Sequence, residues 1–126
     1  MSFLFSFPMM IGVDLLSISR IGRIFRNPRF PKRILSNSEH FEYSSLNNDK
    51  ERIAFLSIRW AVKEAAYKAA YPRKLSWKDI SVFKVDNKPF INLPFSNLIP
   101  HISVSHESDF LIATVILLEK YNQQKI

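Results

Sequence analysis

The sequence predicts an α+β fold, a single domain in which a mainly antiparallel sheet packs on one long central helix. Residues 59–70 hold five alanines, and no glycine or proline follows before Pro72, which is typical of a long helix. The last third of the chain consists of short apolar segments separated by turn residues, which predicts antiparallel hairpins. With 126 residues, 47% of them hydrophobic and 23% charged, the chain is expected to form one domain over residues 1–126.

Residues 9–18 are predicted to form a strand that turns into a helix. Apolar side chains at every second position alternate with Gly12 and Asp14, which is the period of a strand. Gly12 has no side chain to obstruct whatever approaches that face. An acid inside an otherwise apolar strand costs free energy unless it is paired or metal-bound. The alternative is that Asp14 caps a helix or lies in a turn.

Three helices are expected before the β-rich part, over residues 18–25, 36–46 and 48–70. Apolar spacing of three and four predicts the first, which should end at Asn27-Pro28 and Phe30-Pro31. The second and third each begin with Ser or Asn followed three residues later by Glu, the spacing of a capping box. The third should end near Ala70, because the residue before Pro72 is disfavoured in helical geometry.

Two hairpins are expected in the last third of the chain. The predicted strands cover residues 80–85, 90–93, 102–105 and 110–118. The turns are predicted at 86–89 and 106–109, with an irregular segment or brief helical turn at 95–100. Residues 1–9 are expected to be an N-terminal extension, and residues 121–126 a polar tail.

Composition excludes several kinds of site. Only two glycines are present, so neither a Walker loop nor a dinucleotide-binding fingerprint can form. The absence of cysteine removes disulfides, zinc–thiolate sites and thiol nucleophiles. No apolar run approaches the roughly 20 residues of a membrane-spanning helix, and the apolar N-terminus lacks the basic region and cleavage site of a secretory signal. Neither a membrane partner nor secretion is expected.

Basic residues are concentrated in one window of the chain. Against a formal net charge of +7, the segment between Asp14 and Glu39 holds six basic and no acidic side chains. They are Arg20, Arg23, Arg26, Arg29, Lys32 and Arg33. Such a local surplus indicates an acidic partner, which on charge alone is nucleic acid, anionic lipid or an acidic protein.

The long helix divides into two faces at 100° per residue. One is an apolar stripe that narrows to alanine, formed by Phe55, Ile58, Val62, Ala65, Ala66 and Ala69. The other carries Trp60, Lys63, Glu64, Tyr67 and Lys68. In one interpretation Glu64 and Lys68 form an ordinary i, i+4 ion pair worth roughly 0.2–0.5 kcal/mol. In the other, Glu64 is a metal ligand and the lysines contact phosphate.

Asp14 and Glu64 lie on separate elements with lysines nearby, and such a pair suits a magnesium site. Mg²⁺ typically takes one or two protein carboxylates and completes its octahedron with water and substrate phosphates. The three histidines lack any metal-ligand spacing. His106 follows a short strand beside hydroxyl groups, and a purely structural role is the alternative to a functional one there.

Four motifs in order resemble the signatures of the phosphopantetheinyl transferases. They are Gly12-Val13-Asp14 with Ser19-Arg20-Ile21, the segment Trp-Ala-Val-Lys-Glu-Ala-Ala-Tyr-Lys-Ala at 60–69, the turn Asn87-Lys88-Pro89, and Ile-Ser-Val-Ser-His at 102–106. Their order, spacing and the chain length are similar to the short, single-domain branch of that family, the holo-[acyl-carrier-protein] synthases. The resemblance covers roughly residues 11–119 and implies that family's fold.

The resemblance implies a role for each matching residue. Asp14 and Glu64 would bind Mg²⁺, which holds the pyrophosphate of coenzyme A, the co-substrate. The catalytic residues would be Glu64, Lys68 and His106. The contacts to coenzyme A would come from Lys63, Lys68, Arg73, Lys74, Ser105 and His106. Arg20 would dock the acidic acyl carrier protein, on a surface that Arg23, Arg26 and Arg29 also make basic. The family's short form is a homotrimer with active sites between subunits.

The implied reaction transfers the 4′-phosphopantetheine arm of coenzyme A to a carrier serine and releases adenosine 3′,5′-bisphosphate, a step in fatty acid biosynthesis and lipid metabolism. Glu64, His106 and a metal-bound water are the candidate general bases. The chain departs from the family in having no glycine at residues 70–74, and in having Asn87 where the turn glycine stands. The expected compartment is the cytoplasm or the mitochondrial matrix.

Two other functions compete with this one. A non-enzymatic RNA-binding module would explain the basic window but not the paired acids, so a nucleic-acid partner is not expected. A degenerate relative would keep the fold and the trimer without catalysis. The presence of Asp14, Glu64 and Lys68 argues against such a loss.

Overall fold

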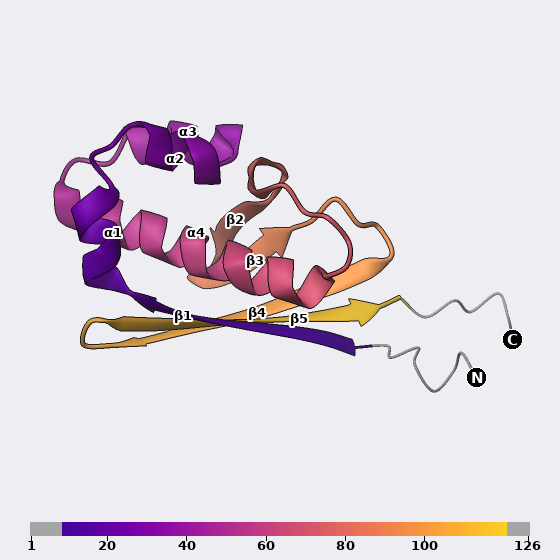
Figure 1. Ribbon diagram of the computed structural model, residues 1–126. Coiled ribbons are helices and arrows are strands. Elements are labelled where there is room, and N and C mark those ends of the chain that lie inside the picture. The colour runs from indigo at the N-terminus through magenta and orange to yellow at the C-terminus, as the bar shows by residue number, and fades with distance from the viewer. Residues whose placement is uncertain (1–8, 121–126) are drawn as a thin grey trace, which may run out of the picture.

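The computed structural model describes residues 9–120 (Figure 1). The helices are α1 (Ile18–Ile24), α2 (Arg29–Ile34), α3 (Asn37–Ser44), α4 (Asp49–Ala70) and the 3₁₀ turn η2 (Trp77–Asp79). The strands are β1 (Met9–Ser17), β2 (Ser81–Val85), β3 (Lys88–Asn92), β4 (Leu98–Glu107) and β5 (Phe110–Glu119). The expected extension and tail lie outside the described residues, apart from Met9, which begins β1.

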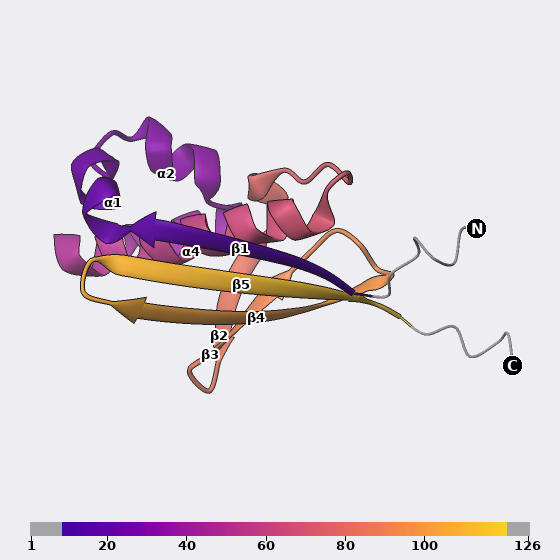
Figure 2. The same ribbon diagram turned by 60° about the horizontal axis from the view of Figure 1, so that its bottom comes forward.

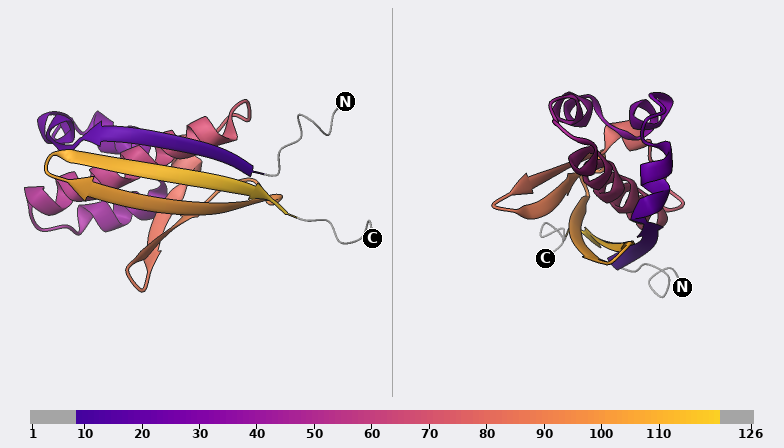
Figure 3. Two further views of the ribbon diagram at one scale, coloured as in Figure 1. Left: turned by 90° about the horizontal axis from the view of Figure 1, so that it is seen from below. Right: turned by 90° about the vertical axis from the view of Figure 1, so that its left-hand side faces the viewer.

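An antiparallel sheet in the order β1-β5-β4 forms one layer of the molecule, and α4 lies across one of its faces. The short helices α2 and α3 lie on the far side of α4 from the sheet, and α1 runs from the end of β1 beside the N-terminal part of α4 (Figure 1; Figure 3, right). The second sheet is the hairpin β2–β3, which projects away from this body (Figure 2). The predicted α+β fold, with an antiparallel sheet on one long helix, is confirmed.

Capping explains where α4 begins and ends. The Asn48 side chain accepts a hydrogen bond of 2.8 Å from the amide of Glu51, as the capping spacing predicted. The helix ends at Ala70 because Tyr71, ahead of Pro72, has an extended ψ of 135°. The alanine stripe is confirmed as the face that packs on the sheet, with Ala65 and Ala66 fully buried.

Helix α2 was not predicted, because two prolines in residues 28–31 were interpreted as ending the preceding helix. α1 ends at Ile24, with Phe25 as its C-cap, and Pro28 stands at the N-cap of α2. Pro31 falls in the first turn of α2, where the backbone N–H of a helix has no intrahelical acceptor and proline is tolerated. Both prolines are therefore compatible with a new helix.

Strand β4 is longer than predicted at both ends. It begins at Leu98, inside the segment expected to be irregular, and includes Pro100. Because β4 is an edge strand of the sheet, it has a neighbouring strand of this sheet on one side only, and proline, which has no N–H to donate, is tolerated there. His106 also belongs to the strand rather than to the turn, which is reduced to Ser108 and Asp109.

The β2–β3 hairpin is confirmed, with a turn shorter than expected. Val85 pairs with Lys88, so the turn consists of Asp86 and Asn87, whose φ angles are 52° and 64°. Two left-handed residues suit the right-handed twist of a two-residue hairpin, and asparagine tolerates this conformation better than most residues. Asn87 therefore serves in place of a glycine.

The outer face of the β1-β5-β4 sheet is apolar along β1 and β5. Its most exposed large apolar side chains are Met9, Ile11, Val13, Leu15, Ile99, Phe110 and Ile112, and they range from 39% to 66% exposed. The inner face instead presents Gly12, Asp14 and Leu16 to α4. In β1, Ile11, Val13 and Leu15 therefore point away from the core, while Leu16 belongs to it. None of the helices within residues 9–120 combines the length and apolar composition needed to span a membrane.

Candidate functional site

Gly12 allows β1 to approach α4 so closely that a side chain would not fit between them. A Cβ atom on Gly12 would lie 1.9 Å from the carbonyl oxygen of Ala65 and 2.8 Å from the amide nitrogen of Ala69. The space beside Gly12 was expected to admit an approaching group, and the group that occupies it is the backbone of α4. This close contact brings the inward-facing Asp14, two residues further along β1, against the same helix.

Asp14 holds a carboxylate oxygen that lacks a hydrogen-bond partner. Its side chain is 13% exposed, and Oδ2 is buried without any donor within the described residues. Oδ1 lies 3.4 Å from the ammonium nitrogen of Lys68. A buried, unpartnered carboxylate oxygen is costly, and a cation bound at that oxygen would remove the cost. The donor set therefore fits a hard cation such as Mg²⁺.

Lys68 contacts β1 rather than the preceding turn of its own helix. Its ammonium donates to the carbonyl of Val13 at 3.0 Å and lies beside Asp14, while its side chain remains 51% exposed. No ion pair joins Glu64 to Lys68 in the part of the chain that the structure describes. The simple i, i+4 surface pair is therefore wrong, because Asp14 has replaced Glu64 as the partner of the lysine.

Glu64 lies one helical turn before Lys68 and is partly exposed. Across residues 9–120 it makes no side-chain hydrogen bond or ion pair. Its carboxylate is thus available to a ligand on the side of α4 that carries Lys68, next to the strand that carries Asp14. Among the described residues there is no group of three or more His, Asp or Glu side chains around a common centre. A cation here would complete its shell with water or substrate oxygens.

Lys63 was expected to share the exposed face with Glu64 and to help bind coenzyme A, but it is fully buried. Its ammonium donates to Glu39 Oε1 at 2.5 Å, to the carbonyl of Ile34 at 2.6 Å and to that of Trp77 at 2.9 Å. All three donor positions are used, so none is left for a ligand. Burial lowers the pKa of the Lys63 ammonium, an effect that the hydrogen-bonded Glu39 carboxylate opposes.

Ser105 and His106 lie at the end of β4, away from Asp14. Ser105 points to the outer face of the sheet, while His106 points to the inner side and is exposed. The register places His106 two strands and two residues from Asp14, a separation of roughly 12 Å. A hollow of about 500 Å³ beside them is lined by Leu15, Ser105, His106, Glu107, Phe110 and Ile112. One chain therefore does not bring His106 to Asp14.

Arg73 and Lys74 follow α4 in the glycine-free loop. The Tyr71–Pro72 peptide bond is cis, and the amide of Arg73 donates to the carbonyl of Ala70 at 2.8 Å. The Arg73 guanidinium lies 3.5 Å from the sulfur of Met10 on β1, and Lys74 is exposed. Both cations thus follow the last turn of α4, which carries Lys68.

The four arginines expected to dock a partner are all exposed, but they differ in their contacts. Arg20 lies over the ring of Trp60, 5.6 Å from its centroid. Within residues 9–120 neither Arg20 nor Arg23 nor Arg29 forms an ion pair. Arg26 is different, because it pairs with Asp49 at 2.5 Å. Three of the four therefore keep a free charge for an acidic partner.

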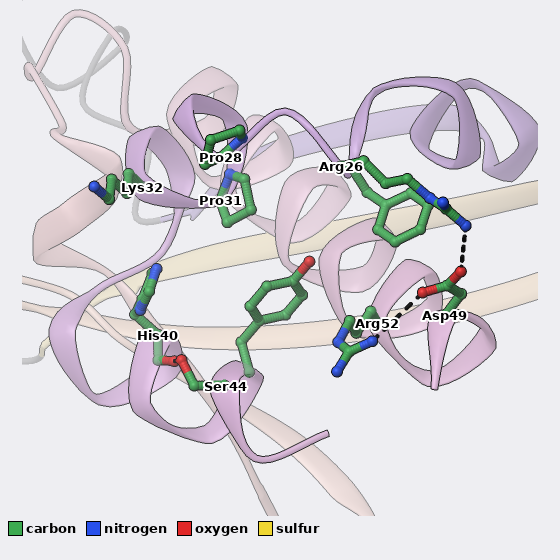
Figure 4. A pocket seen from close by; sticks show the side chains of 10 residues that line it. Arg26, Pro28, Pro31, Lys32, His40, Ser44, Asp49 and Arg52 are labelled. Carbon is green, nitrogen blue, oxygen red and sulfur yellow. Dashed lines mark hydrogen bonds and ion pairs between the residues drawn. The ribbon is translucent and has the colours of Figure 1, made fainter. Parts of the chain in front are cut away.

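Arg26 belongs to a hollow of about 630 Å³ between the α1–α2 connection, α3 and the start of α4 (Figure 4). Arg52 approaches the same Asp49 carboxylate at 3.4 Å. Lys32 and His40 lie on the opposite wall. Because Asp49 pairs with both arginines, the hollow is less cationic than its lining suggests.

Asp109 is a site residue that sequence reasoning missed. Its carboxylate accepts hydrogen bonds from Ser17 and Ser19, which lowers its pKa below the ordinary value of 3.8. The sequence separation of 90 or more residues left no local pattern that could have indicated this contact. The pairing of Asp14 with Lys68, which are 54 residues apart, likewise has no local pattern that could have indicated it.

The unpartnered oxygen of Asp14 can accept a cation, and the exposed Lys68 and the arginines of α1 can pair with anionic groups. Comparison with known proteins gives the class. The family model described as the 4′-phosphopantetheinyl transferase superfamily matches residues 10–115. This chain therefore belongs to the 4′-phosphopantetheinyl transferase superfamily.

Individual relatives are similar over most of their length. A holo-[acyl-carrier-protein] synthase of Mycoplasma mobile is 45% identical over 115 residues, which cover 91% of this chain and 94% of the relative. One from Exiguobacterium is 38% identical over 114 residues, covering 87% and 92%. The crystal structure of a holo-(acyl-carrier-protein) synthase from Bacillus anthracis in complex with CoA (3′,5′-ADP) superposes with a TM-score of 0.77, at 30% identity over 88% of this chain and 96% of that one.

Proposed function

We propose that this chain is a holo-[acyl-carrier-protein] synthase, which transfers the 4′-phosphopantetheine group of coenzyme A to a serine of an apo acyl carrier protein. Similarity to synthases of this name over about nine-tenths of the chain supports the activity. A solved relative in complex with CoA supports coenzyme A as the co-substrate. The observation that carries the site is the free Oδ2 of Asp14 beside Lys68.

In the reaction the serine oxygen of the carrier attacks the phosphorus on the pantetheine side of the pyrophosphate. The new bond is the serine phosphodiester, and the bond that breaks joins this phosphorus to the bridging oxygen. Adenosine 3′,5′-bisphosphate leaves with that oxygen, and the serine proton passes to a base, for which Glu64 and His106 are the candidates. The protein's part is to position both reactants and to stabilise negative charge.

Asp14 and Glu64 are the residues that would hold Mg²⁺, which when bound neutralises charge on the pyrophosphate. Lys68 is half exposed beside Asp14 and adds a cation that can reach phosphate oxygens. Arg73 and Lys74 extend this charge beyond the end of α4. Lys63 has no place in the proposal, because its ammonium is buried and fully hydrogen-bonded.

The acidic carrier would dock on α1 and α2 through Arg20, Arg23 and Arg29. Arg26 is not included, because binding the carrier would require it to break its ion pair with Asp49. Replacing Arg20 by Glu should weaken carrier binding and flatten its salt dependence, because rim charges mainly steer association. Affinity for coenzyme A should change little, as measured by titration of each substrate separately. If the affinities for the carrier and for coenzyme A fell equally, the proposed docking role of Arg20 would be wrong.

A homotrimer is part of the proposal. The apolar outer face of the sheet is a large exposed patch of the kind that marks protein interfaces. His106 and Ser105 lie too far from Asp14 to share a site within one chain. In a site formed between two subunits, His106 and Ser105 of one subunit would lie near Asp14 of the other. Sedimentation analysis tests the assembly, and a monomer at working concentration would contradict it. We place the reaction in the cytoplasm or the mitochondrial matrix.

One experiment tests the function as a whole. The protein is incubated with coenzyme A, Mg²⁺ and an apo acyl carrier protein, and the carrier is weighed by mass spectrometry. We expect the carrier to gain the mass of one phosphopantetheine arm, with no gain when its acceptor serine is replaced by alanine. An unchanged mass with several carriers would overturn the proposal.

A further inference from the structure

The turn between β4 and β5 is tied to the start of α1 by four hydrogen bonds. The Asp109 carboxylate accepts from the hydroxyl of Ser17 at 2.5 Å and from that of Ser19 at 2.9 Å. It also accepts from the backbone amide of Ser19 at 2.9 Å. The fourth bond runs from the amide of Ile18 to the carbonyl of Asp109 at 2.7 Å. Figure 1 shows this turn lying beside the junction of β1 and α1.

Asp109 replaces the local cap of α1. Ser17 stands at the N-cap position, but its own side chain makes no capping hydrogen bond. Its hydroxyl donates to Asp109 instead, and Asp109 receives the amide of the second helical residue, Ser19. A carboxylate is favourable there, because the first amides of a helix lack intrahelical partners and carry partial positive charge. The start of α1 is therefore defined by a residue some 90 positions away in the chain.

The same short turn follows the end of β4. Ser105 and His106, which are proposed to lie at coenzyme A, precede Asp109 by only four and three residues. Arg20 follows Ser19 directly, and Arg23 lies one turn further along α1. Asp109 thus connects the strand end proposed to contact coenzyme A, with Ser105 and His106, to the helix proposed to dock the carrier, with Arg20 and Arg23.

The position of Arg20 is determined by contacts at both of its ends. Its backbone follows the hydrogen-bonded Ser19, and its guanidinium lies over Trp60 on α4, 5.6 Å from the ring centroid. α1 is only seven residues long, and a helix of that length has little stability without such contacts. Removing the contact at the start of α1 would leave Arg20 and Arg23 on a helix held mainly by the buried Ile21.

We propose that Asp109 is a positioning residue for the transfer reaction. It holds α1, and with it Arg20 and Arg23, at a set place relative to the strand end that carries Ser105 and His106. This inference rests on the proposed function, because it assigns the two substrates to these elements. Loss of the Asp109 contacts should therefore impair use of the carrier more than use of coenzyme A.

The test compares Asp109→Asn with the matched control Glu119→Gln, which removes a carboxylate charge from the exposed far end of β5. Asparagine keeps the shape of Asp109 but can accept fewer of the three side-chain hydrogen bonds. For Asp109→Asn we expect the KM for the apo carrier to rise about tenfold, as for the loss of charge-assisted hydrogen bonds. The kcat and the KM for coenzyme A should stay within about twofold, and Glu119→Gln should resemble the parent.

Hydrogen exchange supplies a readout that does not depend on activity. The amide of Ser19 should exchange faster in Asp109→Asn than in the parent, while amides of β5 stay protected. Equal rises in KM for both substrates, or an unchanged KM for the carrier, would overturn the inference while the parent's activity preserves the proposed function. A parent that transfers nothing would overturn both, even if Ser19 responds as expected.

Discussion

Lys63 and Lys68 lie five residues apart on α4, yet one is fully buried and the other is half exposed. Lys63 points toward α2, α3 and η2, where Glu39 and two backbone carbonyls enclose its ammonium. Lys68 points along β1, where it meets one carbonyl and one edge of the Asp14 carboxylate. The two sides of one helix therefore use the same residue type for different purposes.

The difference lies in how completely each lysine is satisfied. The Lys63 ammonium makes three hydrogen bonds to protein atoms, and Glu39 also accepts from the amides of Ser36 and Val82. Lys63 therefore joins α4 to α2, α3 and η2. Asp14, in contrast, keeps a free oxygen, and Glu64 lacks any partner in the described chain. The unpartnered carboxylate oxygen of Asp14 can accept a ligand cation, whereas the Lys63 ammonium has no donor position left.

The largest effect should come from Lys63→Met, which removes the cation hydrogen-bonded to the buried Glu39 carboxylate and leaves only Arg59, whose Nε lies 3.7 Å from Glu39 Oε2. We expect the free energy of unfolding to fall by about 3–5 kcal/mol, which is typical when one partner of a buried ion pair is removed. Urea unfolding followed by circular dichroism measures it. The double variant with Glu39→Gln should recover part of the loss. A stability unchanged by Lys63→Met would mean that the network does not hold the helices together.

Glu64→Gln should have the next largest effect, and on activity alone. Glu64 lies outside the core and has no partner to lose, so the unfolding free energy should stay within about 0.5 kcal/mol of the parent. Transfer should fall by about 10²-fold or more, because the proposed metal ligand is removed together with one of the two candidate bases. Retention of full activity with Mg²⁺ present would contradict the assignment of Glu64 as a ligand.

Lys68→Met sharpens the contrast with Lys63→Met, because the same change is made on the other side of the helix. The stability change should stay below about 1 kcal/mol, as for an exposed ion pair. Affinity for coenzyme A should fall about tenfold, measured by calorimetry, from the loss of one phosphate contact. Lys68→Arg, which keeps the charge, should recover most of that affinity. If Lys68→Met lowered the free energy of unfolding as much as Lys63→Met, Lys68 would have a structural role like that of Lys63, and the contrast between them would be wrong.

The smallest effect is expected from Asp109, away from both lysines, and it should depend on pH. Hydrogen bonds from Ser17 and Ser19 lower the pKa of Asp109 in the folded state, so the unfolded state binds the proton more readily. The stabilisation is therefore present above the ordinary pKa of 3.8 and is lost as pH falls through the lower folded value. Parent and Asp109→Asn should differ in urea midpoint at pH 7 and converge toward pH 2. A constant difference across this range would refute the linkage.

Local patterns anticipated much of the fold. The capping pairs at Ser36 and Asn48, the helix end before Pro72 and the β2–β3 turn were all predicted, because each depends on contacts within a few residues. Helix α2 was missed because proline in a first turn looks, in sequence, like a helix stop. The length of β4 was underestimated because Pro100 is compatible with a strand only at an edge, and edges are a property of the whole sheet.

The sequence by itself determined the long helix, its alanine stripe, the acid in β1 and the concentration of arginines, because these are matters of residue type and spacing. Only the tertiary structure decided which charged groups are free. Helix periodicity assigned Lys63 and Lys68 to one face, and packing separated them by covering one with α2, α3 and η2. It also paired Lys68 with Asp14 and Asp109 with Ser17 and Ser19. Such contacts depend on which surfaces meet in space, a property that no local pattern encodes.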